Sequence, residues 1–224
     1  MCCCSRSFGF LFQWVTDMAR QRRNARGKLL GPVVTSPADA GLMLRDTQAA
    51  AWWLRPLARY LARREARILE HLAGDPAFPA FVSWDGRRLQ RSAIPGAALQ
   101  DAPATDIAWF RSARRALGRM HRRGVAHNDL AREPNWLVRT DGGAAIIDFE
   151  LAWLDRRRGR LFRLMAREDL RHLLKHKRYY LPGRLTARER ALLERPSAAS
   201  RLWRVTMRPL ARWLRRAATV IAAP

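Results

Sequence analysis

The sequence predicts an α+β fold built as two lobes, a small strand-rich lobe followed by a mainly helical one. Short apolar runs bounded by turn residues occupy residues 31–46 and 80–94, and such runs are typical of strands. Apolar residues recur at helical spacing within 53–72 and 106–122. Residues 95–104 are rich in Ala, Pro and Gly, and they mark the boundary between the lobes.

The composition is that of a globular protein with a strong excess of positive charge. The chain of 224 residues is 48% hydrophobic and has a formal net charge of +24, which favours nucleic acid, an anionic membrane or an anionic substrate as partner. No run approaches the roughly 18 uncharged apolar residues that indicate a spanning helix. The three cysteines stand together at Cys2, Cys3 and Cys4, so we expect no disulfide framework and a cytoplasmic compartment.

Two terminal segments flank the lobes predicted over 31–96 and 97–197. Residues 1–30 read as an extension without a secretory cleavage site, either an incidental tail or a segment that touches a membrane. Residues 198–224 place apolar side chains on one helical face and arginines on the other. This pattern predicts a basic amphipathic helix, either docked on the core or lying peripherally on the inner membrane.

The first lobe begins with two short strands around Val33–Thr35 and Gly41–Leu44. A helix follows over 53–72 and ends at Gly74 and Pro76. Its apolar stripe is expected to face the core and consists of Leu54, Leu57, Leu61, Ile68, Leu69 and Leu72.

Glu65 falls on this apolar stripe. A carboxylate that faces the core costs several kcal/mol unless a cation pairs with it. Arg45, on the preceding strand, is the natural partner. The alternative is that Glu65 reaches solvent or pairs locally with Arg63 or Arg64.

The lobe closes with a hairpin, and the second lobe opens with a helix. Residues 80–94 predict two strands joined by a two-residue turn at Asp85-Gly86. The helix over 106–122 has Thr105 as its candidate N-cap and is ended by Gly124.

A second hairpin is predicted from 136–138, a turn at 141–143 and 144–147, and Asp148 emerges at its end. Residues 155–163 are heavily basic, and a helix over 164–174 carries Asp169. Thr186 and Glu189 then form the capping-box pattern that opens a short helix.

The central stretch of the chain runs from His121 to Glu150. It delivers oxygen-bearing side chains from Asp129, Asn135 and Asp148 through a loop and a hairpin. Oxygen ligands of this kind hold a metal-bound phosphate beside a hydroxyl group that is to be phosphorylated. His127 is interpreted as a structural loop residue rather than as the catalytic base.

This order of elements and motifs resembles the protein-kinase fold. His127-Asn128-Asp129-Leu130 with Asn135 resembles the catalytic loop, and Asp148-Phe149-Glu150 resembles the metal-binding Asp-Phe-Gly motif. Within that superfamily, roughly residues 40–200 are most similar to bacterial RIO-type and lipopolysaccharide-kinase-like (Kdo/heptose kinase) proteins.

The resemblance implies a role for each site residue. Asp129 would accept or orient the proton of the attacking hydroxyl, and Asn135 with Asp148 would hold Mg²⁺. Arg45 with Glu65 would position the α and β phosphates of ATP. Asp169 resembles the helix aspartate that braces the catalytic loop.

The sequence departs from the kinase pattern at several points. Arg45 stands where the strand lysine is expected, no Gly-x-Gly-x-x-Gly precedes it, and Glu150 replaces the motif glycine. Asn128 replaces the loop arginine that reads activation-loop phosphorylation, and no Ala-Pro-Glu follows, which favours a small or lipid-linked acceptor over a folded protein.

The leading hypothesis is therefore an ATP- and magnesium-dependent kinase whose acceptor is a lipopolysaccharide core sugar or another membrane-linked hydroxyl. A RIO-type serine/threonine protein kinase with a basic, RNA-binding surface is one alternative. A pseudokinase that acts as a binding module is the other.

Overall fold

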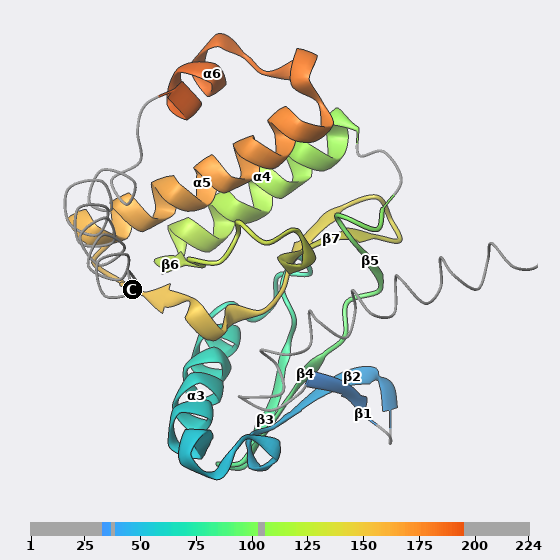
Figure 1. Ribbon diagram of the computed structural model, residues 1–224, viewed down its shortest axis with the longest axis vertical. Helices are drawn as coiled ribbons and strands as arrows, with labels where there is room; N and C mark the ends of the chain where they lie inside the picture. The colour runs from blue at the N-terminus through green and yellow to red at the C-terminus, as the bar shows by residue number, and fades with distance from the viewer. Residues whose placement is uncertain (1–32, 37–38, 103–105, 195–224) are drawn as a thin grey trace, which may run out of the picture.

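The computed structural model describes residues 33–36, 39–102 and 106–194, and it has an α+β fold with a small sheet region and several helices (Figure 1). The predicted extension at 1–30 with its cysteines, the predicted helix at 198–224 and Thr105 lie outside the described residues. Among the described residues, no helix combines the length and apolarity needed to cross a membrane.

The first sheet has four antiparallel strands in the order β1-β2-β4-β3. They are β1 (Val33–Ser36), β2 (Asp39–Asp46), β3 (Phe81–Trp84) and β4 (Arg88–Ser92). All four were predicted from apolar runs and turn residues. Because strands β2 and β4 are direct neighbours, inward side chains on the two strands face the same helix.

The turn of the β3–β4 hairpin lies one residue later than predicted. The Asp85 N–H donates to the carbonyl of Arg88, so the two-residue loop consists of Gly86 and Arg87. Asp85 instead caps the loop, since its Oδ1 accepts the backbone N–H groups of Arg87 and Arg88 at 2.7 and 2.6 Å.

Helix α3 (Arg55–His71) packs along the sheet and is entered through 3₁₀ turns at Thr47–Ala49 and Trp52–Leu54 (Figure 1). Its buried face includes Leu61, Ile68 and Leu69, as the stripe predicted. Leu57 was wrongly assigned to that stripe, because its side chain is 47% exposed.

The segment predicted as a linker contains a strand. β5 (Gly96–Ala98) pairs antiparallel with β7 (Trp136–Arg139), which pairs with β8 (Ala144–Ile146) in a second sheet. The small residues that suggested a linker instead permit close approach, because a Cβ on Gly96 would overlap the carbonyl of Val138.

Helices α4 (Ile107–Arg122), α5 (Arg160–Tyr180) and α6 (Ala187–Glu194) make up the rest, with a short pair of strands formed by β6 (Val125–Ala126) and β9 (Trp153–Leu154). α4 and α5 lie side by side in Figure 1. Asp106 is the N-cap of α4, since its Oδ1 accepts the Trp109 N–H at 2.9 Å.

α5 is much longer than the predicted 164–174. Its first turns carry the arginines of the basic stretch, which have no apolar periodicity, and its last turns bury polar residues such as His176 and Lys177. The capping box of α6 is confirmed by reciprocal bonds between Thr186 and Glu189 of 2.9 and 3.2 Å.

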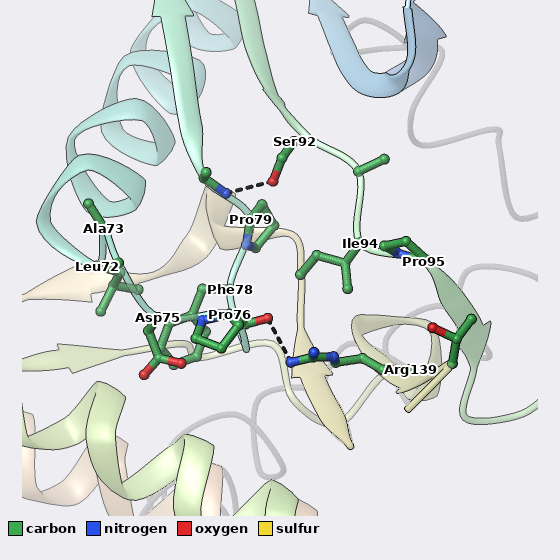
Figure 2. A pocket seen from close by; sticks show the side chains of 14 residues that line it. Leu72, Ala73, Asp75, Pro76, Phe78, Pro79, Ser92, Ile94, Pro95 and Arg139 are labelled. Carbon is green, nitrogen blue, oxygen red and sulfur yellow. Dashed lines mark hydrogen bonds between the residues drawn. The ribbon is translucent and has the colours of Figure 1, made fainter. Parts of the chain in front are cut away.

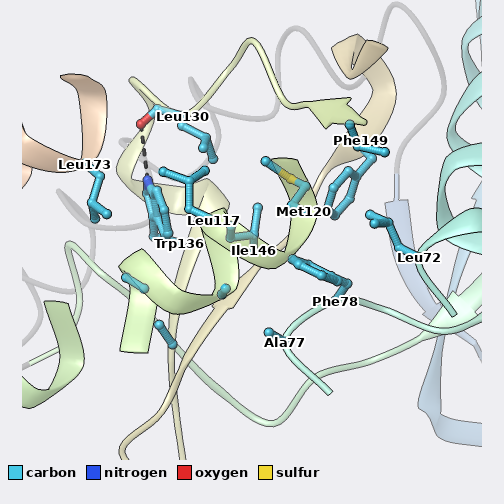
Figure 3. Packing of buried hydrophobic residues seen from close by; sticks show 14 of the residues in the cluster. Leu72, Ala77, Phe78, Leu117, Met120, Leu130, Trp136, Ile146, Phe149 and Leu173 are labelled. Carbon is cyan, nitrogen blue, oxygen red and sulfur yellow. Dashed lines mark hydrogen bonds between the residues drawn. The ribbon is translucent and has the colours of Figure 1, made fainter. Parts of the chain in front are cut away.

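One hydrophobic core joins the helices to the second sheet and to α3 (Figure 3). Leu117 and Met120 of α4 meet Trp136 and Ile146 of the sheet, and Phe149 stands edge-on to Phe78 with ring centroids 5.8 Å apart. The carbonyl of Leu130 accepts both Trp136 Nε1 at 3.2 Å and His176 Nε2 at 3.0 Å, which fixes the loop after β6 on the core.

Candidate functional site

The loop that follows β6 is held in place by hydrogen bonds to α5. Asp169, buried on that helix, accepts the backbone N–H of His127 at 2.8 Å and that of Asn128 at 3.0 Å. His121 Nε2 lies 3.2 Å from the same carboxylate. Asn128 has a φ of +67°, a conformation that asparagine tolerates better than most residues. Asp169 therefore braces the loop, as expected from the sequence.

His127 is a structural residue of this loop. It is fully buried; its Nδ1 accepts the Asp129 N–H at 3.3 Å and its Nε2 lies 3.0 Å from the carbonyl of Ile147. These partners fit a neutral ring that donates from Nε2. Both ring nitrogens are therefore engaged, and the loop presents Asp129 rather than His127.

Asn135 lies beside Asp129. The 3₁₀ turn η3 (Glu133–Asn135) positions Asn135 with only 2% of its surface exposed. Its Nδ2 donates to the Asp129 carbonyl at 2.8 Å and to Asp129 Oδ2 at 3.1 Å. In the described part of the chain, no hydrogen-bond partner reaches Asn135 Oδ1, so this oxygen is left for another donor or a cation.

Asp148 sits at the end of the second hairpin with a φ of +70°, immediately before the 3₁₀ turn η4 (Phe149–Leu151). Arg132 Nη1 is 3.9 Å from Asp148 Oδ2 and 3.5 Å from Asp129 Oδ2, so one guanidinium group lies within 4 Å of both carboxylates. The structure thus brings Asp129, Asn135 and Asp148 together.

Arg45 and Glu65 meet as predicted. Arg45 Nη1 is 3.5 Å from Glu65 Oε2, and Glu65 is completely buried, which excludes the solvent-exposed alternative. The same Arg45 reaches Glu150 Oε2 at 2.5 Å and Asp148 Oδ1 at 3.3 Å. Arg91 approaches the other oxygen of Glu65 at 3.5 Å. Arg45 therefore connects the first sheet to the segment that follows β8.

The charges in this cluster shift one another's pKa values. Burial disfavours the charge of Arg45, but attraction to Glu65, Asp148 and Glu150 outweighs burial and raises the pKa of its guanidinium group. Burial and the neighbouring charge of Asp148 raise the pKa of Glu150, while Arg45 opposes that rise. Arg45 is thus permanently charged, and its positive charge offsets the mutual repulsion of the three carboxylates.

Sequence reasoning missed three members of the site. Arg91 lies two residues after the buried Leu89 on β4, so both side chains are on the face of the strand that packs against α3. The period-two alternation of a strand could have predicted this position. Glu150 was noted only as a replacement for glycine. Arg132 could not be identified from the sequence. In so basic a chain, nothing local distinguishes a loop arginine with a site contact from one that points into solvent.

The oxygen ligands of the site suit a hard cation. Asp148 supplies carboxylate oxygens and Asn135 an amide oxygen, which are ligands that Mg²⁺ accepts in proteins. Among the described residues, no group of three or more His, Cys, Asp or Glu side chains is arranged to hold a metal ion by itself. A cation held here would take its remaining ligands from water or from the oxygens of a bound ligand.

A cavity of about 470 Å³ lies apart from this cluster, between the connection from α3 to β3 and the turn of the β7–β8 hairpin (Figure 2). Its charged side chains are already engaged: Asp75 is paired with Arg119 at 2.5 Å, and Arg139 donates to the carbonyl of Pro76. We therefore assign the candidate site to the polar cluster rather than to this cavity.

No protein-family model and no curated protein sequence matches the chain.

Proposed function

We propose that the chain is an ATP-dependent phosphotransferase of protein-kinase-like, two-lobed architecture, related to the RIO-type and lipopolysaccharide-kinase-like proteins. The observation that carries the proposal is the meeting of Asp129, Asn135 and Asp148 beside the buried Arg45–Glu65 pair. These residues come from four separate segments of the chain, namely β2, α3, the loop after β6 and the segment after β8. Their convergence is what in-line phosphoryl transfer needs, namely a proton acceptor, oxygen ligands for a cation and a fixed positive charge.

In the proposed reaction, the acceptor hydroxyl oxygen forms a bond to the γ-phosphorus of ATP while the bond to the β–γ bridging oxygen breaks. ADP leaves with that bond's electron pair, and Asp129 takes the hydroxyl proton and passes it to solvent. Asn135 holds Asp129 in place through its Nδ2. Catalysis then depends mostly on positioning.

Asp148 and Asn135 Oδ1 would hold Mg²⁺, whose charge would neutralise the phosphates of ATP. Arg45 would contribute a fixed positive charge toward the α and β phosphates, with Glu65 orienting its guanidinium group. Because Arg45 also pairs with Asp148 at 3.3 Å, binding of a cation by Asp148 would weaken that pair and free one side of the guanidinium fork.

An acceptor on an anionic membrane, such as a lipopolysaccharide core sugar, is supported by the outer side of α3. Trp52 and Trp53 are 78% and 61% exposed at its start, and Tyr60 is 61% exposed one helical turn past the exposed Leu57. Exposed arginines share this outer side, namely Arg59, Arg63 and Arg67. Aromatic rings beside arginines match the interface of an anionic bilayer, where rings enter the headgroup region and guanidinium groups meet phosphates.

A binding module without catalysis is the second candidate function, and the contacts of Arg45 favour it. In the structure Arg45 forms ion pairs with both Asp148 and Glu150, and its contact with Glu150 is 2.5 Å long. If a nucleotide and a cation do not displace these contacts, the cluster is a structural ion network rather than a catalytic site.

The first test is the thermal shift caused by Mg²⁺ and ATP in the wild type and in Asp148→Asn. Asparagine tolerates the positive φ of this position, so the variant should keep the fold. Asp141→Asn, on the exposed turn of the same hairpin, is the matched control. At 100 times the dissociation constant, ATP should stabilise the wild type and the control by about 2.7 kcal/mol and Asp148→Asn much less. An equal shift in all three, or none in the wild type, would favour the binding module.

The membrane acceptor is tested by co-sedimentation with vesicles of phosphatidylglycerol and phosphatidylcholine. Trp52→Ser/Trp53→Ser should bind several-fold more weakly than Tyr179→Ser, which removes a 77% exposed aromatic ring from α5 instead. Equal binding by both variants contradicts contact through α3. Salt-sensitive binding to RNA in preference to vesicles would favour the RIO-type protein kinase.

A further inference from the structure

The basic stretch predicted from the sequence forms the turn between β9 and the start of α5. Asp155 holds this turn: its Oδ1 accepts the Arg157 N–H and its Oδ2 accepts the Gly159 N–H, both at 2.9 Å. Arg158 has a φ of +50°, which is unfavourable for a residue with a Cβ. The single carboxylate of the stretch thus accepts hydrogen bonds from backbone N–H groups, while the arginines of the stretch are exposed.

These arginines and the end of α4 surround a cavity of about 420 Å³. The buried ring of Phe162 meets the half-buried ring of His121 edge-on, with centroids 6.2 Å apart, and both line the cavity. The other lining residues are all arginines, namely Arg122, Arg157, Arg158 and Arg163. Four positive charges therefore share one concave surface whose lining contains no acidic residue.

The positive charge of this cavity is unbalanced. Within the described ranges, no carboxylate lies within 4.0 Å of any of the four guanidinium groups. Arg163 uses one donor on the carbonyl of Arg158 at 3.3 Å. An anion in the cavity would relieve the mutual repulsion of these charges.

We propose that this cavity binds the phosphate group of a compact phosphomonoester, such as a sugar phosphate. Guanidinium groups bind phosphate with paired, charge-assisted hydrogen bonds, and several of them suit a dianion. A volume of about 420 Å³ exceeds that of a phosphate ion and is in the range of small-ligand pockets, so a sugar-sized body fits beside the phosphate. The proposal does not rest on the proposed phosphotransfer, since binding is measured directly.

The cavity is also connected to the candidate site. His121 lines the cavity, and its Nε2 lies 3.2 Å from Asp169 Oδ2, the oxygen that accepts the His127 N–H. A phosphate that contacts the ring of His121 therefore lies one side chain away from the brace of the loop that carries Asp129.

Isothermal titration calorimetry of the full chain at fixed ionic strength tests this site with inorganic phosphate, pyrophosphate and glucose 6-phosphate. Arg122→Gln/Arg157→Gln should weaken binding of each by about tenfold or more. Arg111→Gln/Arg114→Gln removes the same charge from exposed positions of α4 outside the cavity and should stay within about twofold of the wild type. Circular dichroism establishes that both variants are folded.

Equal weakening in the two double variants, or no binding by the wild type, would overturn the proposal. Asp148→Asn should bind glucose 6-phosphate as the wild type does, which separates this site from a nucleotide site. Short-chain phosphatidic acid provides a lipid headgroup as the alternative source of the phosphate. If glucose 6-phosphate binds more tightly than phosphatidic acid, the phosphate comes from a small phosphomonoester, and the reverse order indicates a lipid headgroup. In either case, loss of the tighter binding in Arg122→Gln/Arg157→Gln supports the site.

Discussion

Arg45 is the residue on which the polar cluster depends. It is 6% exposed and lies within hydrogen-bond or ion-pair distance of three carboxylates that come from α3 and from the segment after β8. Glu65 is balanced in turn by Arg45 and Arg91, each 3.5 Å away. In the described residues neither oxygen of Glu65 accepts a hydrogen bond. The buried negative charge of Glu65 is therefore stabilised by its ion pairs with Arg45 and Arg91.

Replacing Glu65 with glutamine should therefore destabilise the protein by about 2–3 kcal/mol. The variant leaves Arg91 buried without a counter-charge, whereas Arg45 retains Asp148 and Glu150, so the loss is smaller than for an isolated buried pair. Urea unfolding measures it. Glu70→Gln, at an exposed position of the same helix, should change the free energy of unfolding by less than about 0.5 kcal/mol. A similar small change in Glu65→Gln would show that the pair contributes little.

The Arg45–Glu65 pair was predictable because a carboxylate on an apolar stripe requires a cation and the preceding strand offered one. Arg132 was not predictable, since its contacts to Asp129 and Asp148 arise only when the loop and the second hairpin meet. Single inward charges can be inferred from periodicity, whereas contacts between loops require the tertiary fold.

At the scale of elements, Gly124 lies where α4 has ended and packs against Asp155, the residue that follows the end of β9. Its φ is +77°, and a Cβ at this position would lie 2.5 Å from the carbonyl oxygen of Asp155. Gly142 in the β7–β8 turn has nearly the same φ of +75°, but a Cβ there would meet nothing within 4 Å. The two glycines thus share a backbone conformation and differ in the space around them.

Gly142→Ala should cost about 1–2 kcal/mol, the price of a left-handed conformation for alanine. Gly124→Ala should cost about 1–3 kcal/mol more, because the chain around Asp155 must move. Thermal unfolding of the two variants measures the difference. If they are equally stable, the approach of β9 to the end of α4 is not tightly constrained.

Element types followed from periodicity more reliably than element ends. α5 extends from Arg160 to Tyr180 because tertiary contacts bury its polar last turns, which carry no apolar signal. β5 was hidden in a stretch of small residues, since its pairing with β7 needs little side-chain bulk. The capping box of α6, by contrast, is a local interaction and was read directly from two residues.

For the whole molecule, the net charge of +24 sets the response to salt. Repulsion among exposed arginines opposes folding and is screened over roughly 10 Å at 0.1 M salt. The melting temperature should therefore rise by a few degrees, or about 1 kcal/mol, between 20 and 300 mM NaCl. KCl should have the same effect, because screening depends on ionic strength. A fall in the melting temperature would mean that attractive surface pairs dominate.

The hydrogen bonds that anchor the loop after β6 should make Leu130 more tolerant of substitution than its two partners, Trp136 and His176. Trp136 and His176 both donate from their side chains, while Leu130 accepts through its backbone carbonyl. Any apolar residue that fills the space of Leu130 keeps that carbonyl, whereas few residues replace an indole or imidazole donor. Saturation mutagenesis should thus find Leu130 permissive toward other aliphatic residues and its two donors nearly invariant, although all three are buried at the same place.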